Sequence, residues 1–302
     1  MADSLTVTPN PRPICVGIAD IRIGISSSDP NLHIGLDDDM RAFSATPDSA
    51  DLSLETCWRT LEDNSCAGQK LFDSGGTWQL YFQDDSYWFY CNAPAFGIIP
   101  YKVARINSDF SNGQVFLHRP FFGIEQTVYP LQYPLDELLL LNLLSRGRGV
   151  EVHACGIVDY TGDGYLFVGH SGAGKTTMAR LWEKQPGVTI LSDDRIILKH
   201  ELGRIWMYGT PWHGEAELAS ASRAQLRHIF FIHHGRRNSL KPKIGAESAA
   251  LLFSSSFPVF YSPEALEFTI QFYGNVVKTV PCSKLSVVPN FEIIDFIRQQ
   301  LP

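Results

Sequence analysis

The chain has 302 residues, and its 44% hydrophobic and 19% charged residues are typical of a globular protein with a substantial core. Its formal net charge of -7 argues against the basic face of a nucleic-acid binder, so we expect no nucleic-acid partner. No apolar run reaches the roughly 18–20 residues that a membrane-spanning helix needs, so we expect no membrane partner either.

The start of the chain and its cysteines bear on its location in the cell. Met1-Ala2-Asp3-Ser4 has neither the basic start nor the apolar stretch of a signal peptide. The six cysteines are scattered and include no Cys-x-x-Cys pair, so they do not predict a disulfide scaffold. We therefore expect reduced thiols and a cytoplasmic protein.

The first part of the chain, residues 1–130, is rich in aromatic and turn residues and is predicted to be a mostly β domain of unknown role. Two aromatic runs, 78–82 and 87–91, flank a polar turn and predict a hairpin. Further strands are predicted at 102–106 and 115–118, with a turn around 111–113. The acidic run 37–39 is interpreted as an exposed turn.

A second domain is predicted from residue 131 to residue 302. The prolines at 130 and 134 break the chain, and a helix follows with Asp136 and Glu137 in its first turn, where negative charge suits the helix dipole. Short apolar strands then alternate with loops and helices. The predicted strands are 150–158, 165–168, 188–191, 196–198, 205–208, 229–232 and 268–272, and the further predicted helices are 176–184 and 291–301.

The segment Gly169-His-Ser-Gly-Ala-Gly-Lys-Thr-Thr177 fits the pattern Gly-x-x-x-x-Gly-Lys-Ser/Thr, with a predicted strand before it and a helix after it. Its glycines permit backbone conformations with positive φ, so that successive N–H groups can turn inward around phosphate oxygens. The helix that follows adds the positive end of its dipole. A serine nucleophile elbow is excluded, because Ala173 stands where that motif needs a glycine.

This motif predicts a site for a nucleoside triphosphate, ATP with Mg²⁺. Lys175 is expected to reach the β- and γ-phosphates, and the Thr176 hydroxyl to ligate Mg²⁺. The residues expected to hold the nucleotide are Gly169, Ser171, Gly172, Ala173, Gly174, Lys175, Thr176 and Thr177.

Two adjacent carboxylates, Asp193 and Asp194, follow the apolar strand 188–191. Phosphoryl transfer needs a metal ligand and a group that takes the proton of the attacking hydroxyl, and a pair of carboxylates can divide these tasks. The sequence leaves open which of the two is the base, and a solvated turn remains the alternative. His153 lies on the predicted strand before the glycine-rich segment, where a core histidine is the alternative to a functional one.

Taken in order, His153-Ala-Cys-Gly-Ile-Val, the Gly169–Thr177 motif and Ser192-Asp193-Asp194 resemble the catalytic domain of HPr kinase/phosphorylase. That family is similar in turn to ATP-dependent phosphoenolpyruvate carboxykinase. The resemblance covers roughly residues 131–302. It implies an α/β fold, in which an HPr-kinase-like P-loop catalytic domain follows the mostly β N-terminal domain.

The resemblance also assigns roles. It implies that Asp193 and Asp194 contain the base, that His153 orients or polarises this pair, and that Mg²⁺ is held by Thr176, Asp194 and the later Glu215. The family's Glu-x-Arg-Gly-Leu-Gly signature is absent, and Tyr208-Gly-Thr-Pro-Trp-His-Gly-Glu215 stands in its place. That signature is associated in the family with phosphorylase activity and with recognition of the phosphocarrier, so the resemblance leaves both open. It is closer to divergent HPr-kinase-like proteins, some of which modify a serine hydroxyl of a peptide.

The function expected from the sequence is ATP- and Mg²⁺-dependent phosphorylation of a hydroxyl acceptor, on a peptide, a protein or a small metabolite. The alternative is a nucleotide-gated binding protein with slow ATPase activity. The sequence does not identify the acceptor. Because the resembled family forms rings, the resemblance also allows a homo-oligomer. A basic stretch, 233–243, is a further candidate for a loop that closes over the triphosphate.

Overall fold

The computed structural model describes residues 12–47, 49–62, 68–123, 127–243 and 245–301. Met1 to Ser4 and Cys66, which entered the prediction of a reduced cytoplasmic protein, lie outside these residues. The five described cysteines form no disulfide. Within the described residues, none of the helices has the length and apolar character of a membrane span.

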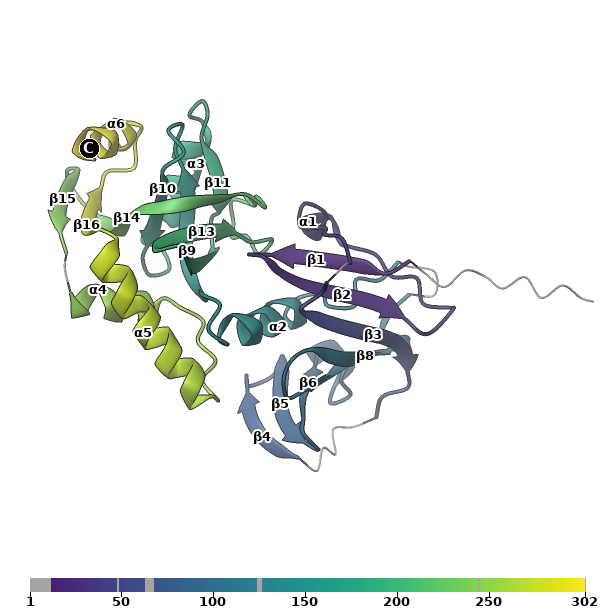
Figure 1. Ribbon diagram of the computed structural model, residues 1–302. Helices are drawn as coiled ribbons and strands as arrows, with labels where there is room; N and C mark the ends of the chain where they lie inside the picture. The colour runs from purple at the N-terminus through teal and green to yellow at the C-terminus, as the bar shows by residue number, and fades with distance from the viewer. Residues whose placement is uncertain (1–11, 48, 63–67, 124–126, 244, 302) are drawn as a thin grey trace, which may run out of the picture. The chain divides into compact units, whose positions relative to one another are not determined.

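The chain is a mixed α/β protein with two large sheets, and it divides into two compact units, Met1–Leu140 and Leu141–Pro302 (Figure 1). Helix α2 (Leu135–Leu144) runs across the point of division. As predicted, it begins after the proline-bracketed break and carries Asp136 and Glu137 in its first turn.

The first unit is built on an eight-stranded sheet with the order β1-β2-β3-β8-β7-β6-β5-β4. The β2–β3 and β3–β8 pairs are parallel, and the other pairs are antiparallel. Its elements are β1 (Ile14–Ile18), β2 (Ile21–Ser27), α1 (Asp38–Arg41), β3 (Leu52–Arg59), β4 (Gln69–Asp73), β5 (Trp78–Gln83), β6 (Ser86–Cys91), β7 (Lys102–Asn107) and β8 (Asn112–His118), with short 3-10 turns at Pro94–Phe96 and Arg119–Phe121.

The predicted hairpin is present as β5 and β6. Asp84 and Asp85 join the two strands with φ of 48° and 52°, and two successive positive φ values match the right-handed twist of a tight hairpin. The turn between β7 and β8 comes earlier than predicted, because the Asn107 side chain accepts the N–H groups of Ser111 and Asn112 and β8 starts at Asn112. The acidic run 37–39 is also corrected, because it enters the short helix α1.

The second unit contains β9 (Val150–Val158), β10 (Gly164–Val168), α3 (Lys175–Glu183), β11 (Thr189–Ser192), β12 (Arg195–Glu201), β13 (Arg204–Gly209), β14 (Arg223–His234), β15 (Ser239–Pro242), α4 (Ala246–Ser254), α5 (Pro263–Thr279), β16 (Cys282–Val287) and α6 (Glu292–Gln300). The sheet order is β10-β9-β12-β13-β14-β16-β15, and β11 pairs with β9. Because β14 also pairs with β10 in parallel, the pairings of β10, β9, β12, β13 and β14 form a closed circuit.

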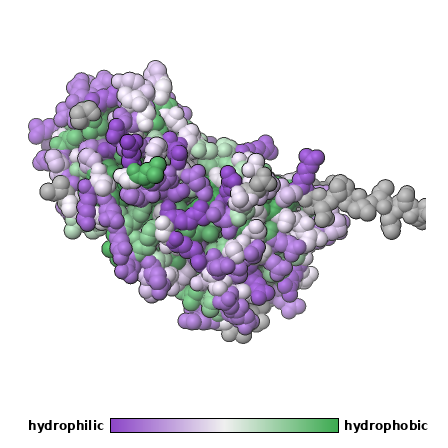
Figure 2. All heavy atoms as spheres, viewed as in Figure 1, coloured by the Kyte–Doolittle hydropathy of each residue, from purple (hydrophilic) through white to green (hydrophobic). Residues whose placement is uncertain are grey.

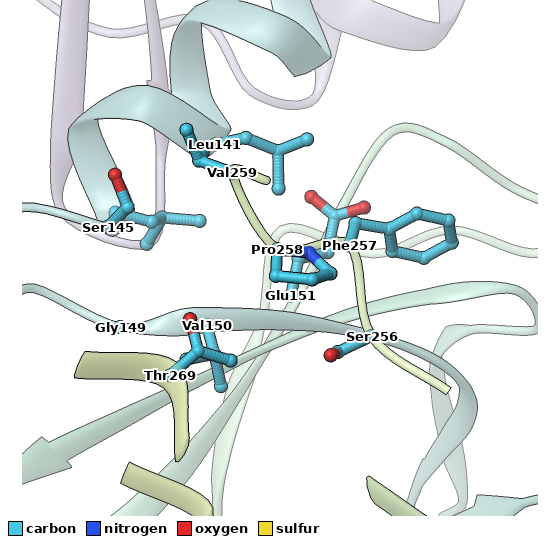
Figure 3. A pocket seen from close by; sticks show the side chains of 11 residues that line it. Leu141, Ser145, Gly149, Val150, Glu151, Ser256, Phe257, Pro258, Val259 and Thr269 are labelled. Atoms are coloured by element: carbon cyan, nitrogen blue, oxygen red, sulfur yellow. The ribbon is translucent and has the colours of Figure 1, made fainter. Parts of the chain in front are cut away.

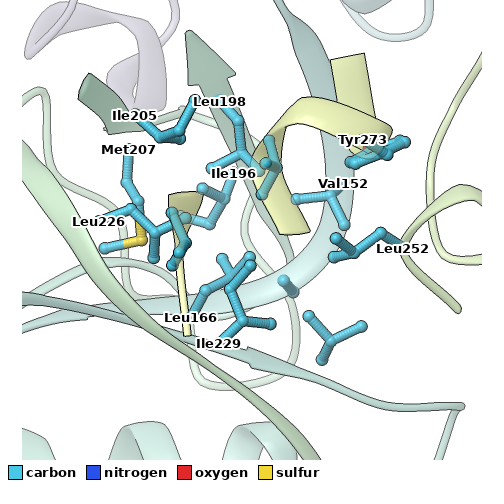
Figure 4. Close-up of a cluster of buried hydrophobic side chains, with 14 of the residues drawn as sticks. Val152, Leu166, Ile196, Leu198, Ile205, Met207, Leu226, Ile229, Leu252 and Tyr273 are labelled. Carbon is cyan, nitrogen blue, oxygen red and sulfur yellow. The ribbon is translucent and has the colours of Figure 1, made fainter. Parts of the chain in front are cut away.

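Two apolar clusters lie on opposite faces of this sheet, because alternate residues of each strand point to opposite sides. Leu166 and Val168 of β10 belong to one cluster, together with residues of α4 and α5, as Figure 4 shows for its central members. Tyr165 and Phe167 belong to the other cluster, together with residues of α3 and α6. The second unit is therefore a sheet with two helices on each face.

One predicted strand, 268–272, is wrong, because these residues lie inside α5. The Ser262 side chain caps this helix by accepting the N–H of Ala265, and Pro263 occupies its first turn. Its buried residues recur at helical spacing over 265–276, and the five residues 268–272 are too few to show that spacing. The buried residues are Ala265, Thr269, Phe272, Tyr273 and Val276.

The large apolar side chains that remain exposed come from separate parts of the chain, and polar residues cover much of the face seen in Figure 2. They are Ile98, Tyr133, Tyr160, Leu202, Leu251, Phe260, Ile270 and Phe291.

Candidate functional site

The motif predicted to bind phosphate forms a loop between β10 and α3, and we call residues 169–177 the glycine loop. Both predicted flanking elements are present. Gly172 and Gly174 have φ of +79° and +106°, a conformation that other residues rarely adopt. A Cβ on Gly169 would lie 2.7 Å from Cβ of Ala173 and 3.2 Å from the carbonyl oxygen of Ile232. Glycine is therefore needed where the loop turns back on the end of β10.

The backbone N–H groups of this loop are available to an anion. Among the described residues, no backbone group accepts a hydrogen bond from the N–H of Ser171, Gly172 or Gly174. The first N–H groups of α3, at Lys175 and Thr176, have no acceptor within the helix. The positive end of the helix dipole adds to these donors.

Lys175 is the buried cation of the glycine loop. Its side chain folds back so that Nζ donates to the carbonyl oxygens of Gly169, at 2.8 Å, and His170, at 3.4 Å. Burial lowers the pKa of Lys175, and the charge of Arg195 lowers it further. A buried cation whose Nζ donates to carbonyl oxygens would be stabilised further by an anion beside it.

The other residues predicted to hold nucleotide and metal lie at the start of α3. Thr176 is half-buried, whereas Ser171 and Thr177 are exposed. Arg180 follows Thr176 by four positions, so both side chains lie on one face of the helix. Arg180 donates to the backbone oxygen of Glu215, at 3.1 Å, and therefore brings that residue to the same face of α3.

Asp193 is almost completely buried, with 1% of its surface exposed. Its two carboxylate oxygens accept the backbone N–H groups of Gly214, at 2.8 Å, and Ala216, at 3.0 Å. Gly214 fits closely, because a Cβ there would lie 2.8 Å from Oδ2 of Asp193. Asp193 therefore holds the segment that carries Glu215.

Asp194 has different surroundings from those of its neighbour. Its side chain is 24% exposed, and Oδ1 lies 3.1 Å from Nδ1 of His153. Its other oxygen forms an ion pair with Arg195. Arg195 and His153 are direct partners in the pairing of β12 with β9, which explains why the three side chains meet.

His153 is half-buried beside Asp194 and within electrostatic range of Lys175. Although the Asp194 carboxylate is near, burial and the charges of Lys175 and Arg195 together lower the pKa of His153 to about 4. The imidazole is therefore neutral at physiological pH. It can donate or accept a hydrogen bond, but it does not add positive charge to the site.

The loop from Thr210 to Ala216 is fixed at several points. Ser192 Oγ donates to the carbonyl oxygen of Trp212, at 3.1 Å, and Thr210 Oγ1 donates to that of Arg195, at 2.8 Å. The indole N–H of Trp212 is buried and has no partner among the described residues. The Glu215 side chain at the end of this loop is exposed.

The structure thus brings His153, Asp194 and Lys175 into one neighbourhood and joins Asp193, Glu215 and α3 through backbone contacts.

The basic stretch 233–243 is different from the predicted loop. Residues 239–242 form β15, which pairs with β16, and Lys243 forms an ion pair with Glu247. Only Arg236 and Arg237 remain in the turn after β14, so this stretch is not one continuous basic loop.

Two residues near Asp194 and His153 were not predicted from the sequence, the buried Glu151 and the aromatic Phe257. The contacts of Arg195 with both Asp194 and His153 were not predicted either. An available signal was the period-two spacing of Glu151 and His153 on one predicted strand, which places both on the same face. No comparable signal marks Phe257, because it comes from a distant loop.

Within the described residues, no group of three or more His, Cys, Asp or Glu side chains is arranged to hold a metal ion. Carboxylate and hydroxyl oxygens are nevertheless present at Asp194, Glu215 and Thr176. Such oxygens suit a hard cation whose remaining ligands come from water or from a phosphate.

No protein-family model and no curated protein matches this chain. Among solved structures, it is similar to the Hpr(Ser) kinase/phosphatase from Coxiella burnetii, with a TM-score of 0.31 and 13% sequence identity. The similarity covers 50% of this chain and 94% of that one.

Proposed function

We propose that this protein is an ATP- and Mg²⁺-dependent kinase that transfers the γ-phosphate to a hydroxyl acceptor. One observation carries the proposal. The helix that follows the glycine loop contacts the segment held by Asp193, because Arg180 donates to the backbone oxygen of Glu215, and the adjacent Asp194 carboxylate contacts the His153 ring. A loop suited to phosphate therefore adjoins a carboxylate suited to accept a proton.

The donors of the glycine loop fit a triphosphate. Its N–H groups without a backbone acceptor among the described residues, the start of α3 and the Lys175 ammonium offer several hydrogen bonds and positive charge to phosphate oxygens. In this proposal, Lys175 exchanges its bonds to the carbonyl oxygens of Gly169 and His170 for bonds to phosphate. Ser171, Gly172, Ala173, Gly174 and the hydroxyls of Thr176 and Thr177 line the same loop.

The oxygens near the loop fit Mg²⁺. This ion is usually bound through one or two carboxylates together with phosphate oxygens and water, so a cage made only of protein ligands is not required. The residues that would hold it are Thr176 and Glu215, whereas Asp194, which the resemblance also implied as a metal ligand, is kept for the proton of the acceptor. When bound, Mg²⁺ supplies positive charge against the phosphate oxygens.

The two aspartates receive separate roles. Both oxygens of Asp193 are used by backbone N–H groups, so we assign Asp193 to holding the loop that carries Glu215. Asp194 is the exposed member of the pair, and we assign it to the proton of the acceptor. His153 orients the Asp194 carboxylate.

The proposed transfer forms one bond to the γ-phosphorus and breaks another. The acceptor oxygen forms a bond to the γ-phosphorus while the bond from that phosphorus to the β,γ-bridging oxygen breaks. The hydroxyl proton passes to Asp194, and ADP leaves. General-base help of this kind typically contributes ~10²–10⁴-fold to the rate.

The test is the transfer of label from γ-labelled ATP with Mg²⁺ into an extract of the source cells, separated into peptide, protein and small-molecule fractions. We expect the native protein to label one fraction, which names the class of acceptor. Asp194→Asn should slow transfer by ~10²–10⁴-fold and leave ATP binding largely intact. Lys175→Ala should lose both binding and transfer.

Glu183→Gln provides a matched control, because it removes one exposed carboxylate at the end of α3, away from the glycine loop. It should behave like the native protein. If the native protein binds ATP but labels no fraction, the kinase proposal is wrong, and a nucleotide-gated binding protein becomes the better explanation. Undiminished transfer by Asp194→Asn would refute the assignment of the base.

A further inference from the structure

Arg195 contacts three polar side chains at the start of β12. Its Nη1 atom pairs with the Asp194 carboxylate and lies 3.1 Å from Nδ1 of His153. Its Nε atom lies 3.5 Å from Oε1 of Glu151. One planar guanidinium thus links Asp194, the proposed base, and His153, which orients it, to the buried carboxylate of Glu151.

Phe257 fixes the plane of this guanidinium. The Arg195 Cζ atom lies 4.1 Å from the centre of the Phe257 ring, and that ring meets the His153 ring edge-on at 6.2 Å. The segment around Phe257 is held against β9, because Phe257 N donates to the backbone oxygen of Glu151 at 3.2 Å. Figure 3 shows the Glu151 carboxylate beside Phe257.

Glu151 is a fixed anchor, because only 2% of its surface is exposed. The cavity beside it has a volume of only ≈ 10 Å³, which is room for about one water molecule, so it is not a substrate pocket. A buried carboxylate stays ionised at low cost only when a cation or hydrogen bonds compensate its charge, and the Arg195 guanidinium is such a cation. The attraction of Glu151 for Arg195 therefore keeps the guanidinium in place.

We propose that Arg195 is a positioning residue, which holds Asp194 and His153 in the geometry that transfer requires and is itself held by Glu151 and Phe257. The inference rests on the proposed kinase function and adds to it the residue that controls the placement of the base. Arg195 acts through Asp194 and His153, because its guanidinium contacts both of these side chains.

A purely structural role is the competing explanation, in which Arg195 only compensates the charge of Glu151. Replacing Arg195 alone does not separate the two roles, because it leaves the Glu151 carboxylate buried without that cation and endangers the fold. The double variant Glu151→Gln/Arg195→Met removes both charges and restores a neutral interior. Glu151→Gln alone weakens the anchor but leaves Arg195 paired with Asp194, so it is the reference that isolates the loss of the guanidinium.

The experiment measures kcat and the KM for ATP in the transfer of label from γ-labelled ATP with Mg²⁺ into the acceptor fraction that the native protein labels, together with the thermal midpoint of each variant. We expect the double variant to fold and to keep the KM for ATP of Glu151→Gln. Its kcat should be lower by about 10–100-fold, the usual effect of removing a residue that orients a functional carboxylate or imidazole.

Arg195→Lys is a second probe, because it keeps a cation beside Glu151 but has no planar fork to reach several partners at once. It should fold and also lose kcat with little change in KM. A double variant as fast as Glu151→Gln, or one that changes only KM, would overturn the positioning role. If the native protein shows no turnover that depends on Asp194, the proposed function fails first, and the inference falls with it.

Discussion

Asp193 accepts two backbone N–H groups in the interior, whereas Asp194 contacts His153 and Arg195 at the surface of the site. The sequence places the two carboxylates side by side and predicts that they divide two tasks. It does not say which task belongs to which residue, because that depends on the loop 210–216, which only folding brings to the end of β11.

Asp193→Asn should destabilise the fold. One acceptor oxygen is replaced by an amide NH₂, which faces a backbone N–H that then has no acceptor. Leaving a buried donor unpaired costs about 1–3 kcal/mol, so we expect the free energy of unfolding to fall by that amount in a denaturant titration. An unchanged free energy of unfolding would show that the loop 214–216 does not depend on Asp193.

Two glycines offer a matched test of the glycine loop. Gly172 and Gly203 have φ of +79° and +78°, and a Cβ on either would meet no atom within 4 Å. Alanine at either position should cost about 1–2 kcal/mol of stability through backbone strain alone. Only Gly172→Ala should also weaken ATP binding, measured by titration with a fluorescent ATP analogue. Equal ATP affinity of both variants would contradict the proposed phosphate site.

At the scale of elements, β14 is a strand whose full length cannot be predicted from its short apolar run alone. The sequence predicts a strand at 229–232, and the structure extends it to Arg223–His234. The extension includes polar residues because β14 pairs with β13, β10 and β16 along its length, so its backbone hydrogen bonds are satisfied by three partners. Tertiary pairing, rather than local composition, sets the ends of this strand.

His228 lies within this extension and gives β14 a dependence on pH. Its ring stacks on Phe230 at 4.4 Å, and Nε2 lies 2.9 Å from the hydroxyl of Ser283 on β16. Burial lowers the pKa of His228 from 6.5 to about 4. In the unfolded chain the imidazole binds a proton at a higher pH than in the folded chain.

The free energy of unfolding should therefore be highest above about pH 6.5 and fall as the pH decreases toward about 4, by at most about 1.4 kcal/mol per pH unit from this group. His228→Gln keeps a hydrogen-bonding group toward Ser283 but cannot take up a proton. We expect its denaturation curves to show a shallower loss of stability in this range than those of the native protein. Parallel pH profiles of the two proteins would contradict the assignment of this pH dependence to His228. The pKa of His153 is lowered in the same direction, but His153 is present in both proteins and contributes equally to their profiles.

On the scale of the whole molecule, each compact unit has its own large sheet, and every residue proposed to hold ATP, Mg²⁺ or the proton belongs to Leu141–Pro302. Nucleotide should therefore slow hydrogen exchange first in the glycine loop and around Asp193 and Asp194, since a ligand stabilises the folded state that binds it. Exchange in the sheet of Met1–Leu140 should change little.

Exchange measured by mass spectrometry with and without Mg²⁺ and ATP checks this expectation, and Lys175→Ala serves as the control that should show no protection. Protection confined to the sheet of the first unit would contradict it. Protection of both units would instead favour the alternative function, in which nucleotide controls how the N-terminal unit meets a partner.

The sequence by itself determined the features that local chemistry encodes. A strand, a glycine-rich turn and a helix around 169–177 follow from apolar periodicity and the φ values that glycine permits, and the β5–β6 hairpin follows from its polar turn. The mixed α/β character was predicted in the same way. The role of the N-terminal unit, the acceptor, the oligomeric state and the location in the cell stay predictions or open questions.

Tertiary structure alone decided what depends on residues far apart in the chain. It made 268–272 part of a long helix, because Phe272, Tyr273 and Val276 are buried in one cluster with residues of the sheet. It gave the two aspartates different partners: Asp193 binds the backbone of the loop 210–216, and Asp194 contacts His153 on the neighbouring strand β9. It also joined Glu151, Arg195 and Phe257 around His153, since β-sheet register and the crossing of a distant segment, not spacing in the sequence, bring these side chains together.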